Sequence, residues 1–346
     1  MREHLEGYLK ERFGESIRLH DFRRLGAGVH GTGFLVEIET EKGVIPYVLK
    51  DLAPEGLGHD YPSDRAGVFL LAFDEYGKLP NHIKAIDVLT KKADGTFKSI
   101  SGGTEYFLLM EKAEGISYFS DLDDMARLES LREVDRVRIE ALSSYLVNIH
   151  SIKKKSRSLY WRKIRDTIGH GECLMGVFDT YPDGTLSYKE MATIEKKTID
   201  WRARLKSKEY RLSQIHGDFH PGNIWFKNES EFILLDRSRG PWGEPADDIT
   251  ALTINYIFFS IKYHGFVTGA YMKALNLFFE SYVNRSGDSE IFSVLQPFYA
   301  FRGAVVANPV FYPELNTDQR KKLFRFMENV LDSPTFDPSK VNEYIS

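Results

Sequence analysis

The chain has 346 residues, enough for about two domains of ordinary size. A net charge of −4 gives no global attraction to nucleic acid or to an anionic membrane. The single cysteine, Cys173, excludes an internal disulfide and a thiolate metal cluster. The charged segment 1–6 does not resemble a signal peptide, and no run of about 20 apolar residues is present. We therefore expect a cytoplasmic protein that binds neither nucleic acid nor membrane.

The first third of the chain has the pattern of β-strands. Residues 17–25, 34–40 and 44–49 are rich in apolar and β-branched side chains and are joined by short turns, which predicts three antiparallel strands. Two further strands are predicted at 86–89 and 106–110, on either side of the polar turn 93–95. One main helix is expected at 64–76, with Ser63 as its N-cap.

After Gly115 the pattern becomes mainly helical. The predicted helices span 121–131, 135–149, 245–263, 267–283, 291–306 and 317–331. This predicts a β-rich domain at 1–112 and a mainly helical domain at 113–346. A basic cluster at 153–165, interrupted by Tyr160 and Trp161, would suit nucleic acid or an anionic ligand. A solvated helix end or connecting loop explains it better, because the chain as a whole is not basic.

The most informative segment is 215–226, in which a polar centre lies between apolar flanks. Pro221-Gly222 forces a turn, so a loop enters a strand at 224–226, and a second strand at 232–235 ends at Asp236. Two such strands would hold Asp218, Asn223 and Asp236 close together. Phosphoryl transfer requires these residue types, because a carboxylate orients the attacking hydroxyl and oxygen ligands hold Mg²⁺.

The spacing His216-x-Asp218-x-x-x-x-Asn223 resembles the catalytic loop of kinases. The full form, His-Gly-Asp-Phe-His-Pro-Gly-Asn, resembles that of the aminoglycoside phosphotransferase family and its choline kinase-like relatives. The resemblance implies an α+β, bilobal protein kinase-like fold, with a small antiparallel β lobe and a larger, mainly α lobe. It also implies Asp218 as the catalytic base, Asn223 and Asp236 as Mg²⁺ ligands, and ATP or GTP as the phosphoryl donor.

A second match begins at Asp236 and continues to Gly243-Glu244-Pro245 and Asp248. It resembles the metal-binding aspartate of the family, followed by Gly-Asp-Pro-x-x-Asp; Glu244 stands where Asp is usual, and Arg237-Ser238 replaces an aromatic-acidic pair. Asp248 is expected to brace loop backbone near a helix start. We expect His216 to orient the loop by hydrogen bonding and His220 to pack within it.

Gly26, Gly28 and Gly31 satisfy a Gly-x-Gly-x-x-Gly pattern that occurs in dinucleotide-binding folds and in kinase phosphate loops. Asp51 lies at the distance that a dinucleotide site would require. A dinucleotide site needs a helix after the last glycine, whereas 34–40 has the pattern of a strand. The context therefore favours a phosphate-binding loop, and an ordinary hairpin is the alternative.

Lys50 ends the third predicted strand and shares a face with Val48, while Tyr47 and Leu49 point the other way. The segment resembles the kinase Val-Ala-Ile-Lys strand, which implies that Lys50 contacts phosphates and Val48 covers adenine. Asp64 is the nearest candidate for the acidic partner of Lys50, with Asp60 and Glu75 as alternatives. Segment 107–115 resembles the family's hinge, which implies that backbone at Met110 and Lys112 holds adenine.

These observations favour a small-molecule kinase acting on an aminosugar, amino alcohol or sugar. Only eleven residues separate Asp236 from Asp248, too few for the long activation segment on which a protein kinase docks peptides. A protein Ser/Thr kinase and a non-catalytic nucleotide-binding protein remain the alternatives. An anionic acceptor would need arginines such as Arg237 or Arg302 in its pocket. The acceptor and the oligomeric state are left open.

Overall fold

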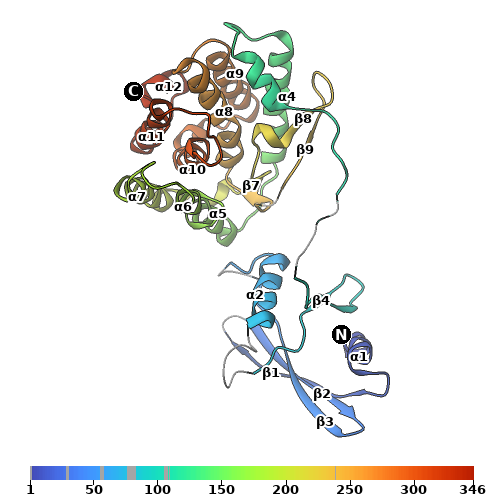
Figure 1. The fold of residues 1–346 in the computed structure, drawn as a ribbon. Coiled ribbons are helices and arrows are strands. Elements are labelled where there is room, and N and C mark those ends of the chain that lie inside the picture. Colours follow the sequence, from blue (N-terminus) through green and yellow to red (C-terminus); the bar gives the residue numbers. More distant parts are fainter. Residues whose placement is uncertain are drawn as a thin grey trace. The chain divides into compact units, whose positions relative to one another are not determined.

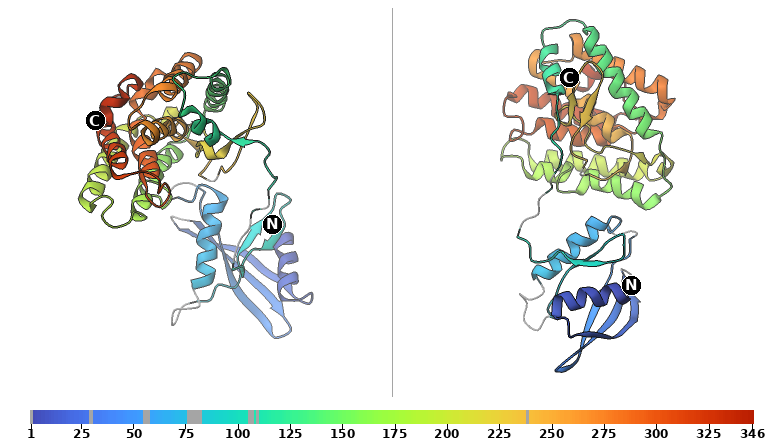
Figure 2. Two further views of the ribbon diagram at one scale, coloured as in Figure 1. Left: turned by 45° about the horizontal axis from the view of Figure 1, so that its top comes forward. Right: turned by 90° about the vertical axis from the view of Figure 1, so that its right-hand side faces the viewer.

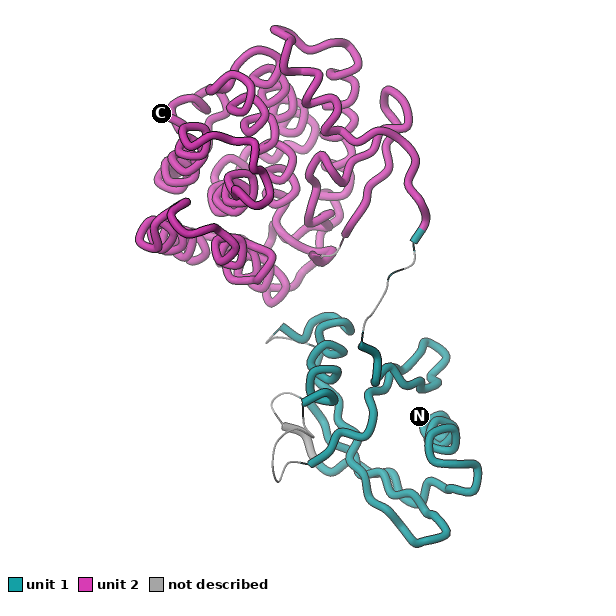
Figure 3. The backbone as a smooth tube through the Cα atoms, in the orientation of Figure 1, with its two compact units in different colours: residues 1–110 teal, residues 111–346 magenta. Residues whose placement is uncertain are grey.

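The computed structural model describes residues 2–28, 31–54, 58–75, 83–104, 108, 110–237 and 239–346. The chain divides into two compact units, residues 1–110 and residues 111–346 (Figure 3). Strands dominate the first unit and helices the second, so the prediction of an α+β fold is confirmed.

Unit 1 is built on a three-stranded antiparallel sheet in the order β1-β2-β3, and helix α1 lies against it (Figures 1 and 2). Leu5 and Leu9 of the helix pack with Val36 and Ile38 of the central strand, which alternate with less buried residues as a half-buried strand requires. The elements are α1 (Arg2–Phe13), β1 (Arg18–Gly28), β2 (Gly31–Thr40), β3 (Gly43–Lys50), α2 (Pro62–Glu75), β4 (Leu89–Lys91) and β5 (Phe97–Ser99).

The two faces of β3 differ as the period of two predicts. Tyr47 and Leu49 pack against the core of unit 1, whereas Val48 is 64% exposed on the other side of the strand. Lys50 therefore shares the solvent-facing side with Val48, and this part of the sequence analysis is confirmed.

Unit 2 is mainly helical and carries short strand pairs. Strands β6, β8 and β9 form one antiparallel sheet, and β7 pairs with β10. The strands are β6 (Ile116–Ser117), β7 (Ser213–Gln214), β8 (Ile224–Phe226), β9 (Phe232–Leu234) and β10 (Trp242–Gly243). The α-helices are α3 (Tyr118–Met125), α4 (Glu133–His150), α5 (Arg157–Gly169), α6 (Leu174–Asp179), α7 (Tyr188–Leu205), α8 (Ala246–His264), α9 (Gly269–Ser286), α10 (Gln296–Ala307), α11 (Thr317–Asp332) and α12 (Val341–Tyr344).

Helix α8 is the centre of unit 2. Every residue from Ala246 to Ile261 is buried, so the helix has no solvent face over four turns. Helices α9 and α10 pack against it (Figure 1). It ends at Gly265, whose positive φ of 79° allows the amide to reach the Ile261 carbonyl. No helix in the described part of the chain is long and apolar enough to cross a membrane.

Several predicted boundaries were wrong. Helix α2 begins at Pro62, before the supposed N-cap Ser63, and the predicted strand at 86–89 keeps only Leu89. The turn at 93–95 instead joins β4 to β5, and most of the predicted strand at 106–110 lies outside the described residues. The helix predicted at 291–306 is interrupted because Pro297 lacks an amide donor and fits only in a first turn, so α10 begins at Gln296.

The sequence analysis also missed five of the described α-helices, α1, α5, α6, α7 and α12. The basic cluster at 153–165 runs into α5, and it is not simply solvated as predicted. Lys163 is buried on this helix and pairs with Asp247 at 2.5 Å. The apparent basic face therefore contains one residue that belongs to the interior.

Gly31 lies where β2 approaches the end of β3. A Cβ atom at this position would lie 2.1 Å from the Asp51 carbonyl oxygen, whereas one at Gly33 would meet only Val48 Cγ1 at 3.9 Å. We predict that Gly31→Ala destabilises unit 1 by about 1–3 kcal/mol and that Gly33→Ala costs much less. Hydrogen exchange of the β2 amides measures this, because all four tryptophans lie in unit 2. Equal protection in the two variants would contradict the steric assignment.

Candidate active site

The loop between β7 and β8 has a fixed backbone conformation. Gly217 adopts a positive φ of 90°, and residues Pro221–Asn223 form a short 3-10 turn. The Asn223 side-chain Nδ2 donates to the Asp218 carbonyl at 3.0 Å and so closes the loop on itself. The same contact leaves the amide oxygen of Asn223 directed away from that carbonyl.

Asp236 is brought to this loop by the β8–β9 hairpin. Ile224 pairs with Leu234 across the hairpin, and the Leu235 amide donates to the Asn223 carbonyl at 2.9 Å. Asp236 follows directly, with a φ of 48°, the one positive φ at a non-glycine residue in the described chain. The structure thus brings together the backbone of the three residues that the sequence analysis grouped.

Asp248, in the first turn of α8, fixes the backbone of the loop by hydrogen bonds. Its two carboxylate oxygens accept the His216 amide at 2.8 Å and the Gly217 amide at 2.7 Å, and the His150 ring lies 3.2 Å away. Asp248 is fully buried, so these contacts replace its hydration. The predicted bracing role of Asp248 is confirmed.

The two histidines of the loop have local contacts. His216 Nδ1 accepts the Asp218 amide at 3.3 Å, and His220 Nδ1 accepts the Gly222 amide at 3.1 Å. The His220 ring also lies beside Phe119. These contacts confirm that His216 orients the loop and that His220 packs within it.

The Asp218 carboxylate is ion-paired, which the sequence analysis did not foresee. Its Oδ1 accepts from Arg302 Nη1 at 2.6 Å and from Arg239 Nη1 at 3.3 Å, and His220 Nε2 lies 3.9 Å from Oδ2. Burial alone would raise the pKa of Asp218, but Arg302, Arg239 and His220 outweigh it and lower the pKa to about 2. The carboxylate is therefore ionised at neutral pH.

Arg237 and Arg302 are engaged within the protein. Arg237 donates to the carbonyls of Ile215 and Pro241, and Arg302 is 4% exposed between Asp218 and Asp247. A role of either arginine in binding an anionic acceptor stays a prediction.

The donor set at 223 and 236 fits a hard divalent cation. The Asp236 carboxylate is exposed and makes no hydrogen bond or ion pair within the described chain. Together with the amide oxygen of Asn223 it offers two oxygen ligands, the type that Mg²⁺ prefers when phosphates and water complete its shell. No group of three or more His, Cys, Asp or Glu side chains that could hold a metal occurs among the described residues, so an all-protein metal cage is not seen there.

The residues predicted to bind nucleotide lie mostly at one end of the sheet of unit 1. Gly26 pairs with Gly33, Gly33 pairs with Lys50, and Gly28 pairs with Gly31. A strand follows the last glycine, and the Asp51 carboxylate accepts the Thr32 amide at 2.6 Å, so the dinucleotide alternative is wrong.

The remaining predicted nucleotide contacts are less closely grouped. Asp64 lies in the first turn of α2, where it accepts the Tyr61 amide at 2.7 Å. Met110 is the last residue of unit 1, and Lys112 lies in the segment that leads to β6. The pairing of Asp64 with Lys50 stays a prediction.

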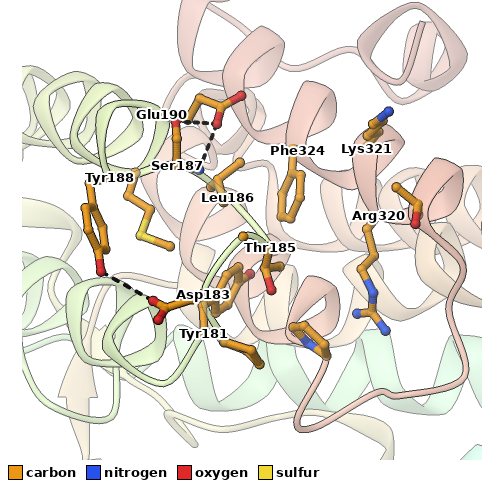
Figure 4. Close-up of a pocket in the computed structure, with 15 residues that line it drawn as sticks. Tyr181, Asp183, Thr185, Leu186, Ser187, Tyr188, Glu190, Arg320, Lys321 and Phe324 are labelled. Carbon is orange, nitrogen blue, oxygen red and sulfur yellow. Dashed lines mark hydrogen bonds between the residues drawn. The ribbon is translucent and has the colours of Figure 1, made fainter.

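A pocket of about 860 Å³ lies elsewhere in unit 2, between the segment that follows α6 and helix α11 (Figure 4). Tyr181 and Phe324 supply apolar surface, and Asp183, Glu190 and Lys321 supply charge. None of the residues predicted for catalysis or metal binding lines it.

Residues 21–263 match the model of the phosphotransferase enzyme family, which is more than half of the chain. The chain belongs to this family. The family resemblance stated in the sequence analysis is thereby confirmed. Comparison with curated protein sequences gave no match.

The solved structures that resemble this chain are distant from it in sequence. The amicoumacin kinase hAmiN, in complex with AMP-PNP and Ca²⁺, is 14% identical at a TM-score of 0.42, with 99% of this chain and 100% of that chain covered. ADP-bound aminoglycoside phosphotransferase APH(2'')-Ib is 15% identical at 0.33, covering 95% and 98%. An ethanolamine kinase of Plasmodium vivax is 11% identical at 0.36, covering 96% and 80%. At these values the likenesses say nothing about the substrate of this phosphotransferase.

The lowered pKa of Asp218 predicts a pH-dependent contribution to stability. The folded-state pKa of about 2 lies below the ordinary value of 3.8, so the contribution is present above pH 3.8 and is lost as the pH falls toward 2. Asp218→Asn should therefore lower the free energy of unfolding most at neutral pH and progressively less below about pH 4. Urea unfolding followed by tryptophan fluorescence measures this. Asp236→Asn removes a neighbouring carboxylate and serves as the control; the same pH trend in both variants would contradict the assignment.

Proposed function

We propose that the chain is a Mg²⁺-assisted phosphotransferase that moves the γ-phosphoryl group of ATP or GTP to a hydroxyl of a small molecule. The observation that supports this most directly is the closed loop in which Asn223 bonds to Asp218 and the β8–β9 hairpin delivers Asp236 beside it. An ionised carboxylate next to two hard oxygen donors is the arrangement that phosphoryl transfer to a hydroxyl requires.

In this proposal Asp218 orients the acceptor hydroxyl and accepts its proton. Asn223 and Asp236 hold Mg²⁺, which neutralises the charge that develops on the phosphates. Because the transition state for phosphoryl transfer is loose, positioning of the hydroxyl contributes more than a strongly basic carboxylate. A base with a pKa near 2 is compatible with this, since it stays ionised and serves as a hydrogen-bond acceptor.

We propose that residues 1–112 bind the nucleotide. Lys50 and the hairpin glycines Gly26, Gly28 and Gly31 bind phosphates, and Val48 covers the base. Exposure of Val48 on the side of the strand that Lys50 shares supports this assignment. Asp64 orients Lys50, and the backbone at Met110 and Lys112 bonds the edge of the base.

A small-molecule acceptor is favoured over a protein. Only eleven residues lie between Asp236 and Asp248. Arg237 bonds to the Ile215 carbonyl and Arg239 to the Asp218 carboxylate, and the rest of the stretch includes β10 and the start of α8. Among the described residues of this stretch, none forms an extended segment on which a peptide could dock. We propose an aminosugar, an amino alcohol or a sugar as the acceptor.

The test measures release of ADP from Mg-ATP and of GDP from Mg-GTP, with a panel of aminosugars, amino alcohols, sugars and a generic protein substrate as acceptors. Asp218→Asn should lower turnover about 10²–10⁴-fold while Mg-ATP binding is kept, because a positioned base acts in the chemical step. Asp94→Asn, at an exposed turn of unit 1, should keep full turnover. Unchanged turnover in Asp218→Asn would contradict the proposal, and phosphorylation of the protein substrate alone would contradict the small-molecule acceptor.

A further inference from the structure

Arg302 lies at an unexpected place for a guanidinium group. It is the one charged residue of helix α10, Gln296–Ala307, and it is 4% exposed. A buried cation is costly unless anions and hydrogen-bond acceptors replace its hydration. The residue also lies beyond the segment 21–263 that matches the family model.

The contacts of Arg302 converge on the catalytic loop. Nη1 donates to Asp218 Oδ1 at 2.6 Å, and Nη2 donates to the Gly217 carbonyl at 3.1 Å and to Asp247 Oδ1 at 2.9 Å. The guanidinium also lies over the Phe301 ring at 4.5 Å. One side chain from a core helix thus contacts both the backbone and the carboxylate of the loop.

Asp247 does not by itself explain why an arginine is present. Its carboxylate is already paired with Lys163 from α5 at 2.5 Å. Lys163, Asp247, Arg302 and Asp218 form a row of alternating charges, in which Asp247 lies between the two cations and Arg302 lies between the two carboxylates. The carboxylate that requires Arg302 is therefore that of Asp218.

Arg239 is a weaker partner for Asp218. Its distance to Oδ1 is 3.3 Å, and it also lies 3.6 Å from Glu172. The other oxygen of Asp218, Oδ2, lies 3.9 Å from His220 Nε2. The shorter bond from Arg302 to Oδ1 thus selects the carboxylate orientation and leaves Oδ2 available for an acceptor hydroxyl.

We propose that Arg302 is a positioning residue for phosphoryl transfer. It fixes the rotamer of Asp218 by a bond to Oδ1 and presents Oδ2 to the hydroxyl that is phosphorylated. Asp247 and Lys163 hold Arg302 in turn and connect the loop to helices α8 and α5. This inference rests on the proposed function, because it assigns Asp218 its catalytic role.

The experiment is a double-mutant cycle on turnover, with Arg302→Met, Asp218→Asn and the double variant. The readout is ADP release from Mg-ATP, with water as the acceptor and with any acceptor found in the panel. We expect Arg302→Met to lower kcat about 10²-fold with KM for Mg-ATP nearly unchanged, since misplacing a catalytic group by about 1 Å has such an effect. In the Asp218→Asn background the same change should lower kcat by less than about threefold, because residues that act as a unit are not additive.

Arg320→Met is the matched control. Arg320 is also a buried arginine of unit 2, but within the described chain its guanidinium bonds only to the backbone carbonyls of Ala307, Tyr312 and Leu315. This variant should lower the melting temperature and keep kcat. Arg302→Lys keeps a buried cation and should retain the fold while losing about tenfold in kcat, so it decides the question if Arg302→Met does not fold.

The outcomes separate the two proposals. Wild-type protein that releases neither ADP from Mg-ATP nor GDP from Mg-GTP with any acceptor would overturn the proposed function and this inference with it. Wild-type turnover combined with full kcat in Arg302→Met, or in Arg302→Lys where only that variant folds, would overturn the inference alone. An equal loss from Arg302→Met in both backgrounds would also overturn it, because the residue would then act on stability and not through Asp218.

Discussion

The site depends on two consecutive aspartates at the buried start of α8. Asp248 accepts two amides of the loop between β7 and β8, and Asp247 points in another direction, to Arg302 and Lys163. Successive residues of a helix point in directions about 100° apart. One helical turn can therefore bind the loop backbone through Asp248 and also orient Arg302, which pairs with the Asp218 carboxylate, through Asp247. Because α8 is buried along most of its length, the rigidity of the core is transmitted to the loop.

Asp218, Asn223 and Asp236 could be grouped from the sequence because short-range geometry settles their placement. The three residues lie within one loop and one hairpin, and a strand–turn–strand pattern fixes which residues are opposite each other. The bracing role of Asp248 was also predictable, since an acidic residue at the start of a helix commonly accepts backbone amides. The faces of β3 followed from the period of two for the same local reason.

Arg302 and Lys163 could not be placed in this way. Arg302 is 84 residues from Asp218 in the chain, and nothing in a helical pattern says which buried partner a cation meets. A signal was present, since a single charge in the otherwise uncharged stretch 296–307 needs a buried counter-ion. Lys163 gave no such signal, because its neighbours in the basic cluster are charged as well. Helices α5 and α7 were missed because polar and charged residues obscured the helical period.

The buried charges around Asp218 also bear on the kind of catalysis that the site can perform. A carboxylate held by two guanidinium groups is a weak base, and a mechanism that required early proton removal would be slowed by them. In a loose transition state the acceptor hydroxyl gains acidity only late, as its bond to phosphorus forms. An ionised, oriented hydrogen-bond acceptor is then sufficient until the proton is released. In the proposed reaction the arginines thus lower the basicity of Asp218, which a loose transition state needs little, and fix the direction of its carboxylate, on which the proposed positioning role depends.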